Sequence, residues 1–435
     1  MSGLFNTSSL MTIPQLHRLF LASDGVCTDT RKIKQNSIFF ALKGDNFNGN
    51  EYAAKAIELG ATFAVIDEIE YNTSEKCILV DSVLKTLQDL ASYHRQYLDI
   101  PVIALTGSNG KTTTKELINA VLSSRFKTTA TLGNLNNHIG VPLTLLSMAK
   151  GTEIGIIEMG ANHIGEIGFL SAIVKPDYGY ITNIGKAHLE GFGSIEGVLK
   201  GKTELYDYLR KQNKLVFLNT EDQKLFNASQ GINAYTFSKT DSSNVTIKLV
   251  DVNPNVTVSY QGITIATNLI GEYNFTNIAA AITIGNYFNC TADQIKTAIE
   301  SYIPTNNRSQ IIKKQKHTII LDAYNANPTS MGAAINNFAQ LQYNSKIVFL
   351  GDMFELGREA SLEHQKIVDQ ISKTKVNEIY LIGNIFFDTK CNDSRIQKFR
   401  SYEDLETNWH LTNKEDAILI KGSRGMKLER ILELL

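Results

Sequence analysis

Apolar runs and amphipathic stretches alternate along the 435-residue chain, most regularly from Pro101 onward. Three times an apolar run enters a glycine-containing turn and then a helical pattern. The first run is VIAL, the second is EIGIIE at 153–158, and the third is DYGYITNI at 177–184, which precedes a helix predicted over 195–211. Strands that alternate with helices in this way form parallel sheets with helices on both faces. We therefore predict an α/β protein with a mostly parallel central sheet.

Two flanking regions and one insertion follow other patterns. Residues 37–80 hold three short apolar runs around the helical pattern EYAAKAIELG, which predicts a small α/β unit that ends near Asp99. Between 244 and 267 apolar and polar residues alternate around an Asn-Pro-Asn turn, which predicts antiparallel strands appended to the sheet. Further runs beyond Pro304 predict a Rossmann-like C-terminal domain. The expected domains are therefore 1–98, 99–304 and 305–435.

Composition excludes some classes of function. Lys and Arg number 43 against 44 Asp and Glu, so the chain has no general attraction for nucleic acid. The four cysteines lie far apart, without the spacing of a metal site, and we expect reduced thiols. The first residues show no secretion signal and no apolar run is long enough to span a membrane. We expect a cytoplasmic protein, without membrane insertion, that acts as a monomer.

The stretch LTGSNGKTTT at 105–114 is the strongest chemical signal. A strand leads into a turn whose backbone amides can converge on phosphate oxygens, while the next helix directs its N-terminus at them. Lys111 would add a positive charge and the Thr112 hydroxyl would ligate Mg²⁺. The pattern GxxxxGK[ST] is incomplete, because Leu105 stands at its first glycine position. The alternative is a plain helix start, with Lys111 solvated and Thr113 as the cap. The strand before and the helix after favour nucleotide binding, through Gly107, Ser108, Asn109, Gly110, Lys111, Thr112 and Thr113.

GSNGKTT and a series of later motifs resemble the Mur ligase family, which includes folylpolyglutamate synthases. In the central region the similar motifs are GNLNNHIGVPLTLL (133–146), EMGANHIGEI (158–167), TNIGKAHLEGFGS (182–194) and GEYNFTNIAAA (271–281). Those in the C-terminal region are DAYNANPTSM (322–331), LGDMFELG (350–357) and KGSRGMKLE (421–429), which are most similar to the member that adds D-alanyl-D-alanine. The resemblance spans almost the whole chain. It implies an ATP-dependent amide ligase that works through an acyl phosphate.

Metal ligands are expected beside the phosphate turn. Glu158 ends one predicted strand and His188 follows the next, at the sheet edge where open α/β sheets bind ligands. The plain alternatives are a solvated carboxylate and a hydrogen-bonded loop histidine. The resemblance favours Mg²⁺ ligation by both, together with Thr112. It also implies that Lys202 reacts with CO₂ to form a carbamate that ligates Mg²⁺, a reaction that requires a neutral amine. Lys200 is the competing position for that modification, and without the resemblance either lysine would be a surface charge.

The resemblance further implies contacts to the nucleotide and to the catalytic residues. Asn277 would bind adenine, although an Asn at this place is also a helix cap. Arg308, Asp322 and Tyr324 would close over ATP from the C-terminal domain, which would exclude water from the acyl phosphate. Lys111, Lys202 and His188 are the expected catalytic residues.

Substrate contacts are assigned by the resemblance alone. Those expected to bind the UDP-N-acetylmuramoyl-tripeptide are Thr30, Arg31, Asn46, Asn48, Asn136, Asn137 and His138. Those expected to bind D-alanyl-D-alanine are Asn325, Asn327 and Arg424, with the 351–357 loop. Such polar residues are often only turn formers, and Arg424 could equally form a surface ion pair.

Several other functions remain as alternatives. A relative that adds a diamino acid one step earlier lacks support, because no DNPR-like motif is present. A folylpolyglutamate synthase would leave the N-terminal segment without a purpose. A P-loop ATPase that drives movement would release phosphate with ATP alone. A nucleotide-binding protein without turnover would have lost some of Lys111, Thr112, Glu158, His188 and Lys202, and all are present.

Overall fold

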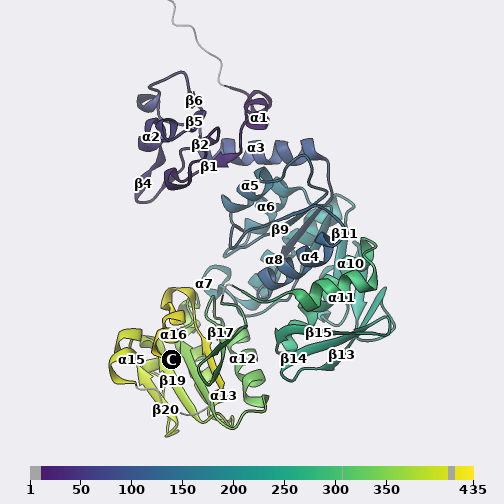
Figure 1. Ribbon diagram of the computed structural model, residues 1–435, viewed down its shortest axis with the longest axis vertical. Helices are drawn as coiled ribbons and strands as arrows, with labels where there is room; N and C mark the ends of the chain where they lie inside the picture. Colours follow the sequence, from purple (N-terminus) through teal and green to yellow (C-terminus); the bar gives the residue numbers. More distant parts are fainter. Residues whose placement is uncertain (1–10, 306, 410–416) are drawn as a thin grey trace, which may run out of the picture. The chain divides into compact units, whose positions relative to one another are not determined.

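The structure of the protein is a computed structural model that describes residues 11–305, 307–409 and 417–435 (Figure 1). By internal contacts the chain forms two compact units. One takes in the chain up to Ala104 together with Lys127–Met159 and Phe169–Asp177, and the other holds the remainder. The predicted domain boundaries do not follow this division, because it cuts through one sheet, and they stay a prediction.

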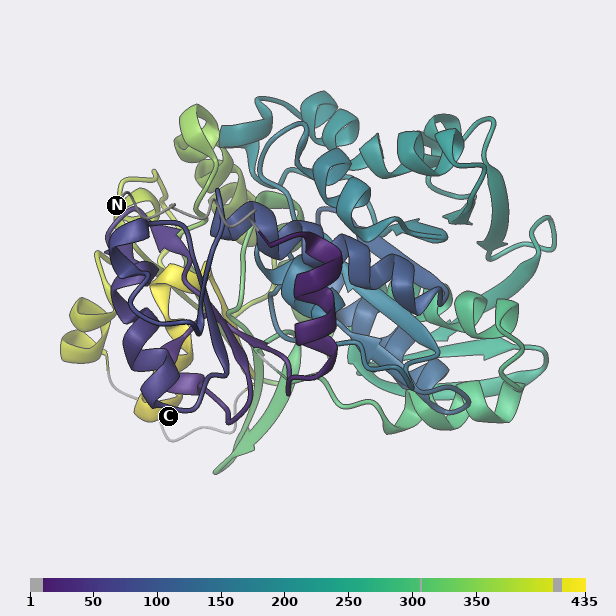
Figure 2. The ribbon, with the colours of Figure 1, turned by 90° about the horizontal axis from the view of Figure 1, so that it is seen from above.

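A four-stranded parallel sheet forms the N-terminal part of the first unit, in the order β1-β2-β5-β6. Helix α2 (Ala53–Glu58) lies beside this sheet (Figure 2), and its buried alanines belong to one hydrophobic cluster with Phe39 and Ile66. Helix α3 (Val83–Leu98) begins at Ser82, whose hydroxyl accepts the amide of Lys85. It contacts α1 (Ile13–Leu21). The strands are β1 (Val26–Cys27), β2 (Ile38–Phe40), β5 (Phe63–Ile66) and β6 (Cys77–Leu79). Between β2 and β5 in the chain, β3 (Lys43–Gly44) and β4 (Phe47–Asn48) form a separate hairpin.

A nine-stranded sheet has the order β15-β14-β13-β12-β11-β10-β7-β9-β8. All five residues of β7 are buried, as expected for a strand covered on both faces. The pairings from β10 to β13 are parallel, and β14 is antiparallel to both of its neighbours, β13 and β15, so the predicted appended strands are confirmed. Its strands are β7 (Val102–Thr106), β8 (Thr128–Ala130), β9 (Ile154–Glu158), β10 (Tyr178–Ile181), β11 (Leu215–Asn219), β12 (Asn233–Ser238), β13 (Val245–Asp251), β14 (Asn255–Tyr260) and β15 (Ile263–Ile270).

Among the helices that accompany this sheet, α8 (Ile195–Lys211) has the bounds that the sequence predicts. Ser194 caps this helix by accepting the amide of Gly197. Helix α10 (Phe275–Tyr287) is almost entirely buried and packs against α4 (Lys111–Ser123). The others are α5 (Gly140–Leu146), α6 (Glu166–Val174), α7 (Leu189–Phe192), α9 (Gln223–Ala228) and α11 (Ala292–Ser301).

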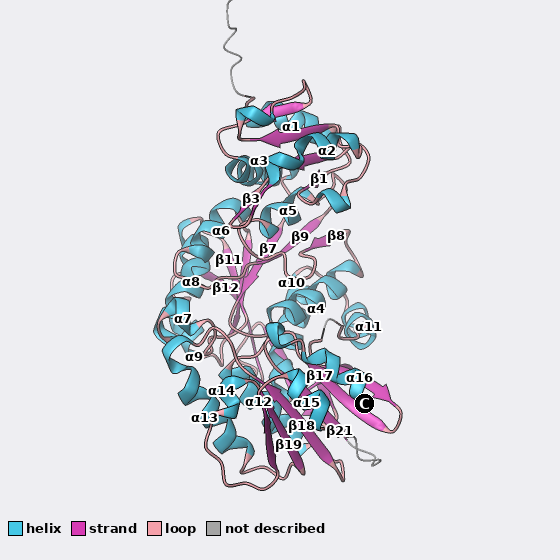
Figure 3. Cartoon of the chain, turned by 90° about the vertical axis from the view of Figure 1, so that its left-hand side faces the viewer, coloured by secondary structure: helices cyan, strands magenta, loops and turns pink. Residues whose placement is uncertain are grey.

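The C-terminal region forms a six-stranded sheet in the order β16-β17-β21-β18-β19-β20. Only β16 is antiparallel to its neighbour, so the predicted Rossmann-like arrangement is confirmed. Helices α12 and α13 lie on one side of this sheet and α15 and α16 on the other (Figures 1 and 3). The elements are β16 (Gln310–Lys314), β17 (His317–Asp322), α12 (Pro328–Gln340), β18 (Lys346–Gly351), α13 (Ala360–Ile371), β19 (Glu378–Ile382), α14 (Asn384–Phe387), β20 (Ile396–Phe399), α15 (Tyr402–Asn408), β21 (Ala417–Lys421) and α16 (Ile431–Leu434).

The sequence pattern misses eight strands. Four of them, β1, β3, β4 and β8, are only two or three residues long. Three others, β12, β16 and β20, contain polar and half-buried positions, which weakens the apolar signal on which strand prediction depends. The last, β11, is a short apolar run without its own glycine turn. Within the described part of the chain, no helix combines the length and apolar character needed to cross a membrane.

Candidate active site

The predicted phosphate turn lies between β7 and α4, as the sequence indicates. Gly107 and Gly110 have φ angles of +143° and +77°, which side chains disfavour. A Cβ on Gly107 would also lie 2.0 Å from Thr182 Oγ1, so only glycine fits this position. Lys111 begins the helix, and its Nζ donates to the carbonyl of Gly107 at 2.8 Å. The turn therefore has the backbone path that a phosphate-binding loop requires.

The segment that follows β10 holds this turn in place. The Ser108 amide donates to the Asn183 carbonyl, and the Ser108 hydroxyl accepts the amide of Gly185 at 2.9 Å. The Asn109 amide donates to Asn183 Oδ1 at 3.1 Å, and Thr182 Oγ1 donates to the Asn109 carbonyl at 2.6 Å. Thr182 and Asn183 were not predicted as site residues, although they lie at the carboxyl end of the predicted run 177–184, which was the available signal.

His188 follows on the same segment and contacts the C-terminal region. Its Nδ1 lies 2.5 Å from Glu355 Oε2. The close approach of the His188 side chain, its charge and that of Lys111 lower the pKa of Glu355, although partial burial opposes the shift. Among the residues that the structure describes, the buried His188 Nδ1 forms no hydrogen bond of ordinary geometry, so this contact is close in distance but not aligned as a hydrogen bond. Nearby, Lys186 Nζ donates to Glu363 Oε1 at 2.7 Å. Glu355, Lys186 and Glu363 escaped the sequence reasoning, because pairs so distant in sequence leave no local pattern.

Lys202 is the buried member of the two candidate lysines. Its side chain is fully buried, whereas Lys200 is exposed. The Lys202 Nζ donates to the carbonyl of Ala161 at 3.0 Å and lies 5.2 Å from the centre of the Phe192 ring. This placement separates the two lysines, which the sequence left open, but it does not test the carbamate.

Glu158, in the first unit, ends β9 in a buried position. Its Oε1 accepts Asn136 Nδ2 at 2.8 Å, and its amide donates to Thr131 Oγ1. Asn137 caps α5 instead, because its Oδ1 accepts the amide of Gly140 at 2.8 Å. His138 is exposed, and its carbonyl accepts Gln88 Nε2. Contact with substrate by these residues stays a prediction.

The acidic and histidine side chains of the described residues do not by themselves form a complete metal site, so a bound Mg²⁺ would also need water or phosphate oxygens as ligands. Among residues 11–305, 307–409 and 417–435, no three His, Cys, Asp or Glu side chains gather into a metal site. Mg²⁺ commonly takes only one or two protein ligands and completes its shell with water and substrate phosphates. The buried Thr112 hydroxyl and Glu158 carboxylate are oxygen donors of the kind that Mg²⁺ prefers, whereas the His188 imidazole is a less usual donor for this ion.

Asn277 lies behind the phosphate turn. It is 3% exposed, its Oδ1 accepts Thr114 Oγ1 at 3.0 Å, and its Nδ2 donates to Asn274 Oδ1 at 2.8 Å. A Cβ on Gly110 would lie 2.6 Å from Asn277 Oδ1. Each amide atom thus has one partner within the protein and one hydrogen-bonding position left, and binding of adenine stays a prediction.

The C-terminal candidates form two local groups. Arg308 stacks on Tyr324, with its guanidinium carbon 3.6 Å from the ring centre. Asp322 Oδ2 accepts the buried Lys421 Nζ at 2.5 Å, and its Oδ1 accepts the amide of Ser309. The sequence analysis did not predict Lys421 as a site residue. The one available signal was its position at the end of an apolar strand.

The residues expected to bind the amine substrate have partners of their own. Asn327 caps α12 through Ser330, and its Nδ2 donates to Asn109 Oδ1 at 2.7 Å, so it joins this helix to the phosphate turn. Asn325 is exposed, and its Oδ1 accepts the amide of Ala326. Arg424 pairs with Glu429 at 2.9 Å, which is the surface ion pair that the sequence left as an alternative.

The N-terminal candidates lie on short turns. Thr30 and Arg31 belong to a 3₁₀ turn, where the hydrogen bonds from Arg31 lower the pKa of Asp29 to about 2. Asn46 is exposed at the tip of the β3–β4 hairpin. Asn48 donates to Glu68 Oε2 at 2.8 Å. Their roles toward a substrate stay predictions.

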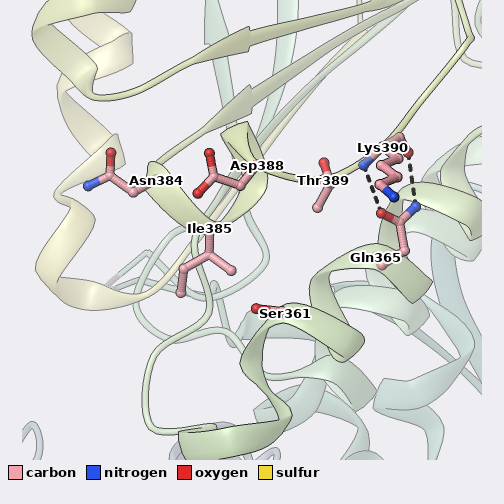
Figure 4. A pocket seen from close by; sticks show the side chains of 7 residues that line it. All are labelled: Ser361, Gln365, Asn384, Ile385, Asp388, Thr389 and Lys390. Atoms are coloured by element: carbon pink, nitrogen blue, oxygen red, sulfur yellow. Dashed lines mark hydrogen bonds between the residues drawn. The ribbon is translucent and has the colours of Figure 1, made fainter.

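A separate cavity of about 570 Å³ lies in the C-terminal region (Figure 4). Gln365 forms one wall by exchanging two hydrogen bonds, of 2.8 and 2.9 Å, with the backbone of Lys390. None of the predicted site residues lines this cavity.

Comparison with known proteins adds family information. Three family profiles match, namely "Mur ligase family, catalytic domain" at 23–95, "Mur ligase middle domain" at 105–285 and "Mur ligase, glutamate ligase domain" at 307–424. The UDP-N-acetylmuramoyl-tripeptide--D-alanyl-D-alanine ligase of Bacillus subtilis is 36% identical over 94% of this chain and 92% of its own. The ligase of the same name from Escherichia coli is 30% identical over 95% and 93%.

Solved structures are similar over nearly the whole chain. A MurF structure from Acinetobacter baumannii aligns with a TM-score of 0.84 and 27% identity, covering 96% of this chain and 97% of that one. MurF from Thermotoga maritima in complex with ADP aligns with a TM-score of 0.82 and 26% identity, covering 95% and 97%. A diaminopimelate ligase structure, at 16% identity, a TM-score of 0.51 and coverage of 93% and 91%, shares the fold alone.

Proposed function

The chain belongs to the Mur ligase family, and we propose that it is the ATP-dependent ligase that adds D-alanyl-D-alanine to a UDP-N-acetylmuramoyl-tripeptide in peptidoglycan precursor synthesis. The alternative, a ligase that adds a diamino acid one step earlier, is less well supported. Relatives at 30–36% identity over nearly the whole chain carry the D-alanyl-D-alanine name, whereas the diaminopimelate ligase resembles this chain in fold alone.

One structural observation carries the ATP-dependent step. The glycine turn between β7 and α4 presents backbone amides and the Lys111 amine at a helix N-terminus, the arrangement that binds nucleotide phosphates. A similar structure holds ADP. We place the triphosphate at Gly107, Ser108, Asn109, Gly110, Lys111, Thr112 and Thr113.

The reaction joins two anions, so their repulsion must be reduced. The tripeptide carboxylate attacks the γ-phosphorus of ATP, ADP leaves, and the acyl phosphate forms. Lys111 and the amides of the turn neutralise charge on the transferred phosphoryl group. Mg²⁺, when bound by Thr112, Glu158 and His188 among its ligands, supplies further positive charge to the phosphates.

The second half of the reaction forms the amide. The amine of D-alanyl-D-alanine attacks the acyl carbon, and the tetrahedral intermediate collapses with loss of phosphate. We assign this substrate to Asn325, Asn327, Arg424 and the 351–357 loop, and the nucleotide-peptide to the N-terminal candidates. Arg308, Asp322 and Tyr324 belong to the nucleotide side, where closure excludes water from the acyl phosphate. The domains 1–98, 99–304 and 305–435 divide these tasks.

A carbamate on Lys202 is the least supported part of this proposal. Burial favours it over Lys200, because loss of solvation favours the neutral amine that CO₂ requires. The alternative is that Lys202 keeps its amine and simply anchors α8 to the Ala161 carbonyl. A cytoplasmic, monomeric enzyme without nucleic-acid partners completes the proposal.

A product assay tests the function. The full chain is incubated with ATP, Mg²⁺, D-alanyl-D-alanine and a UDP-N-acetylmuramoyl-tripeptide that carries lysine or diaminopimelate, and the product is weighed by mass spectrometry. We expect the pentapeptide product, and phosphate release only when all substrates are present. Phosphate release with ATP alone would indicate an ATPase. Ligation of a diamino acid to the dipeptide precursor would indicate the alternative ligase.

A further inference from the structure

Glu355 contacts His188 from a loop that is far away in sequence. The loop follows β18 in the C-terminal region, and His188 stands between β10 and α7. The Glu355 carboxylate faces the His188 Nδ1, and its backbone carbonyl accepts the amide of Glu190 at 3.2 Å. Two separate contacts thus join this loop to the histidine segment.

The loop is held firmly on the N-terminal side of Glu355. The Met353 amide donates to His364 Nε2, and the Phe354 amide donates to Ser423 Oγ, both at 2.9 Å. The carboxylate of Asp352 accepts two amides at the start of α14. Glu355 is therefore presented from a fixed backbone, although its side chain is 49% exposed.

Both residues of the pair hold an unusual backbone conformation. His188 has φ of 51° and Glu355 has φ of 62°, in the left-handed region that residues other than glycine seldom adopt. Such conformations cost free energy and persist where the surroundings require them, often at functional sites. Their meeting across this contact indicates that the histidine is held in a required orientation.

The histidine segment also supports the phosphate turn. Asn183 and Gly185 hydrogen-bond to Ser108 and Asn109, five and three residues before His188. Lys111 lies close enough to Glu355 for its charge to act on that carboxyl group. The orientation of the His188 ring is thus set beside the residues that we expect to bind phosphate.

We propose that Glu355 is a positioning residue, whose carboxylate beside His188 Nδ1 favours a proton on that nitrogen and thereby keeps the other ring nitrogen, Nε2, available as a metal ligand. Histidines that ligate metals commonly donate their second ring nitrogen to a carboxylate, which sets the tautomer and the ring orientation. Because Glu355 comes from the C-terminal region, the tautomer and orientation of the His188 ring are fixed only while that region contacts the segment after β10. The kinetic test of this inference rests on the proposed function, because it measures ligase activity. The spectroscopic test does not, because it measures only the tautomer of His188.

The first test reads the tautomer of His188 without substrates or metal. The full chain is labelled with ¹⁵N-histidine and long-range ¹H–¹⁵N spectra are recorded at about pH 8, where histidines are mostly neutral. The chain has 8 histidines, and a His188→Gln sample assigns the signal. We expect a proton on Nδ1 in the wild type and in Glu355→Gln, whose amide oxygen still accepts. In Glu355→Ala and Glu355→Lys the proton should shift to Nε2 or exchange between both nitrogens.

The second test compares kinetic constants. Loss of such an outer-shell carboxylate commonly lowers activity about 10- to 100-fold, so kcat of Glu355→Ala should fall by that factor with little change in KM for ATP. Glu355→Gln should keep more activity than Glu355→Ala. The control is Glu359→Gln, which removes a nearby exposed carboxylate outside the site.

Two results would overturn the inference. One is an unchanged His188 tautomer in both Glu355→Ala and Glu355→Lys. The other is a kcat for Glu355→Ala equal to that of the Glu359→Gln control. If the wild type makes no pentapeptide product, the proposed function fails, while the spectra still decide the role of Glu355.

Discussion

Replacement of Asn277 by alanine distinguishes a structural role from a base-binding role. The side chain lies behind the phosphate turn with both amide atoms bonded to other buried side chains, Thr114 and Asn274. The resemblance to the Mur ligase family instead implies contact with adenine. The two interpretations predict different changes in stability and in nucleotide affinity.

The structural interpretation has a definite magnitude. The substitution leaves the Thr114 hydroxyl and the Asn274 carbonyl oxygen without these partners, at 0% and 3% exposure of their residues. Each unsatisfied buried group costs about 1–3 kcal/mol. Water can enter the space that the shorter side chain leaves, so we expect a total loss of about 2–4 kcal/mol in the free energy of unfolding. For a chain of 435 residues that unfolds cooperatively, the apparent Tm should fall by about 2–4 °C.

The assay combines unfolding with nucleotide titration. Urea unfolding of the ligand-free chain is compared for the wild type, Asn277→Ala, Thr114→Val and the double variant. Because the two side chains share a hydrogen bond, their effects should be non-additive, with an interaction energy of about 1 kcal/mol. Isothermal titration with ATP and GTP then measures affinity, and both nucleotides should be affected alike.

The reasoning is refuted if Asn277→Ala unfolds at the same urea concentration as the wild type, with additive effects of the two substitutions. Loss of affinity for ATP but not for GTP, without loss of stability, would instead support contact with adenine.

Three further predictions concern other parts of the chain. Gly107→Ala should abolish nucleotide binding in a titration, because its Cβ would lie 2.0 Å from Thr182 Oγ1; retained affinity would contradict the close packing of the turn. Lys202→Ala should lose most ligase activity and regain part of it when a small carboxylic acid is added, and full activity without the acid would end the carbamate proposal. Burial lowers the pKa of His17 and His94, whose rings share a 3.0 Å hydrogen bond, so the unfolded chain binds more protons as pH falls below about 6.5. The free energy of unfolding, measured in urea, should therefore keep its highest value above that pH and decline below it. His94→Gln should show a smaller decline.

Much of the fold is predictable because it depends on local pattern. Buried strands such as β7 and β9 are continuous apolar runs, and β14 alternates buried and half-buried positions as a one-sided strand should. The bounds of α8 follow from Ser194, whose hydroxyl caps the first turn. Strands with weak apolar character, such as β16, escape this reasoning.

The candidate site divides in the same way. The phosphate turn is readable because the motif is contiguous and its glycines carry the required backbone angles. The contact between Glu355 and His188 joins residues that the sequence places 167 positions apart, and no local pattern marks either residue as the partner of the other. The link from Asn327 to Asn109 has the same origin.

The amino-acid sequence by itself determined the alternation of strands and helices, the glycine turn and the family, because each depends on neighbours along the chain. Tertiary structure alone decided that Lys202 rather than Lys200 is buried, that Asn277 is bonded behind the turn, and that Glu355 faces His188. These outcomes depend on how distant segments pack, and packing is set by the shape and charge of surfaces that form only when the chain has folded.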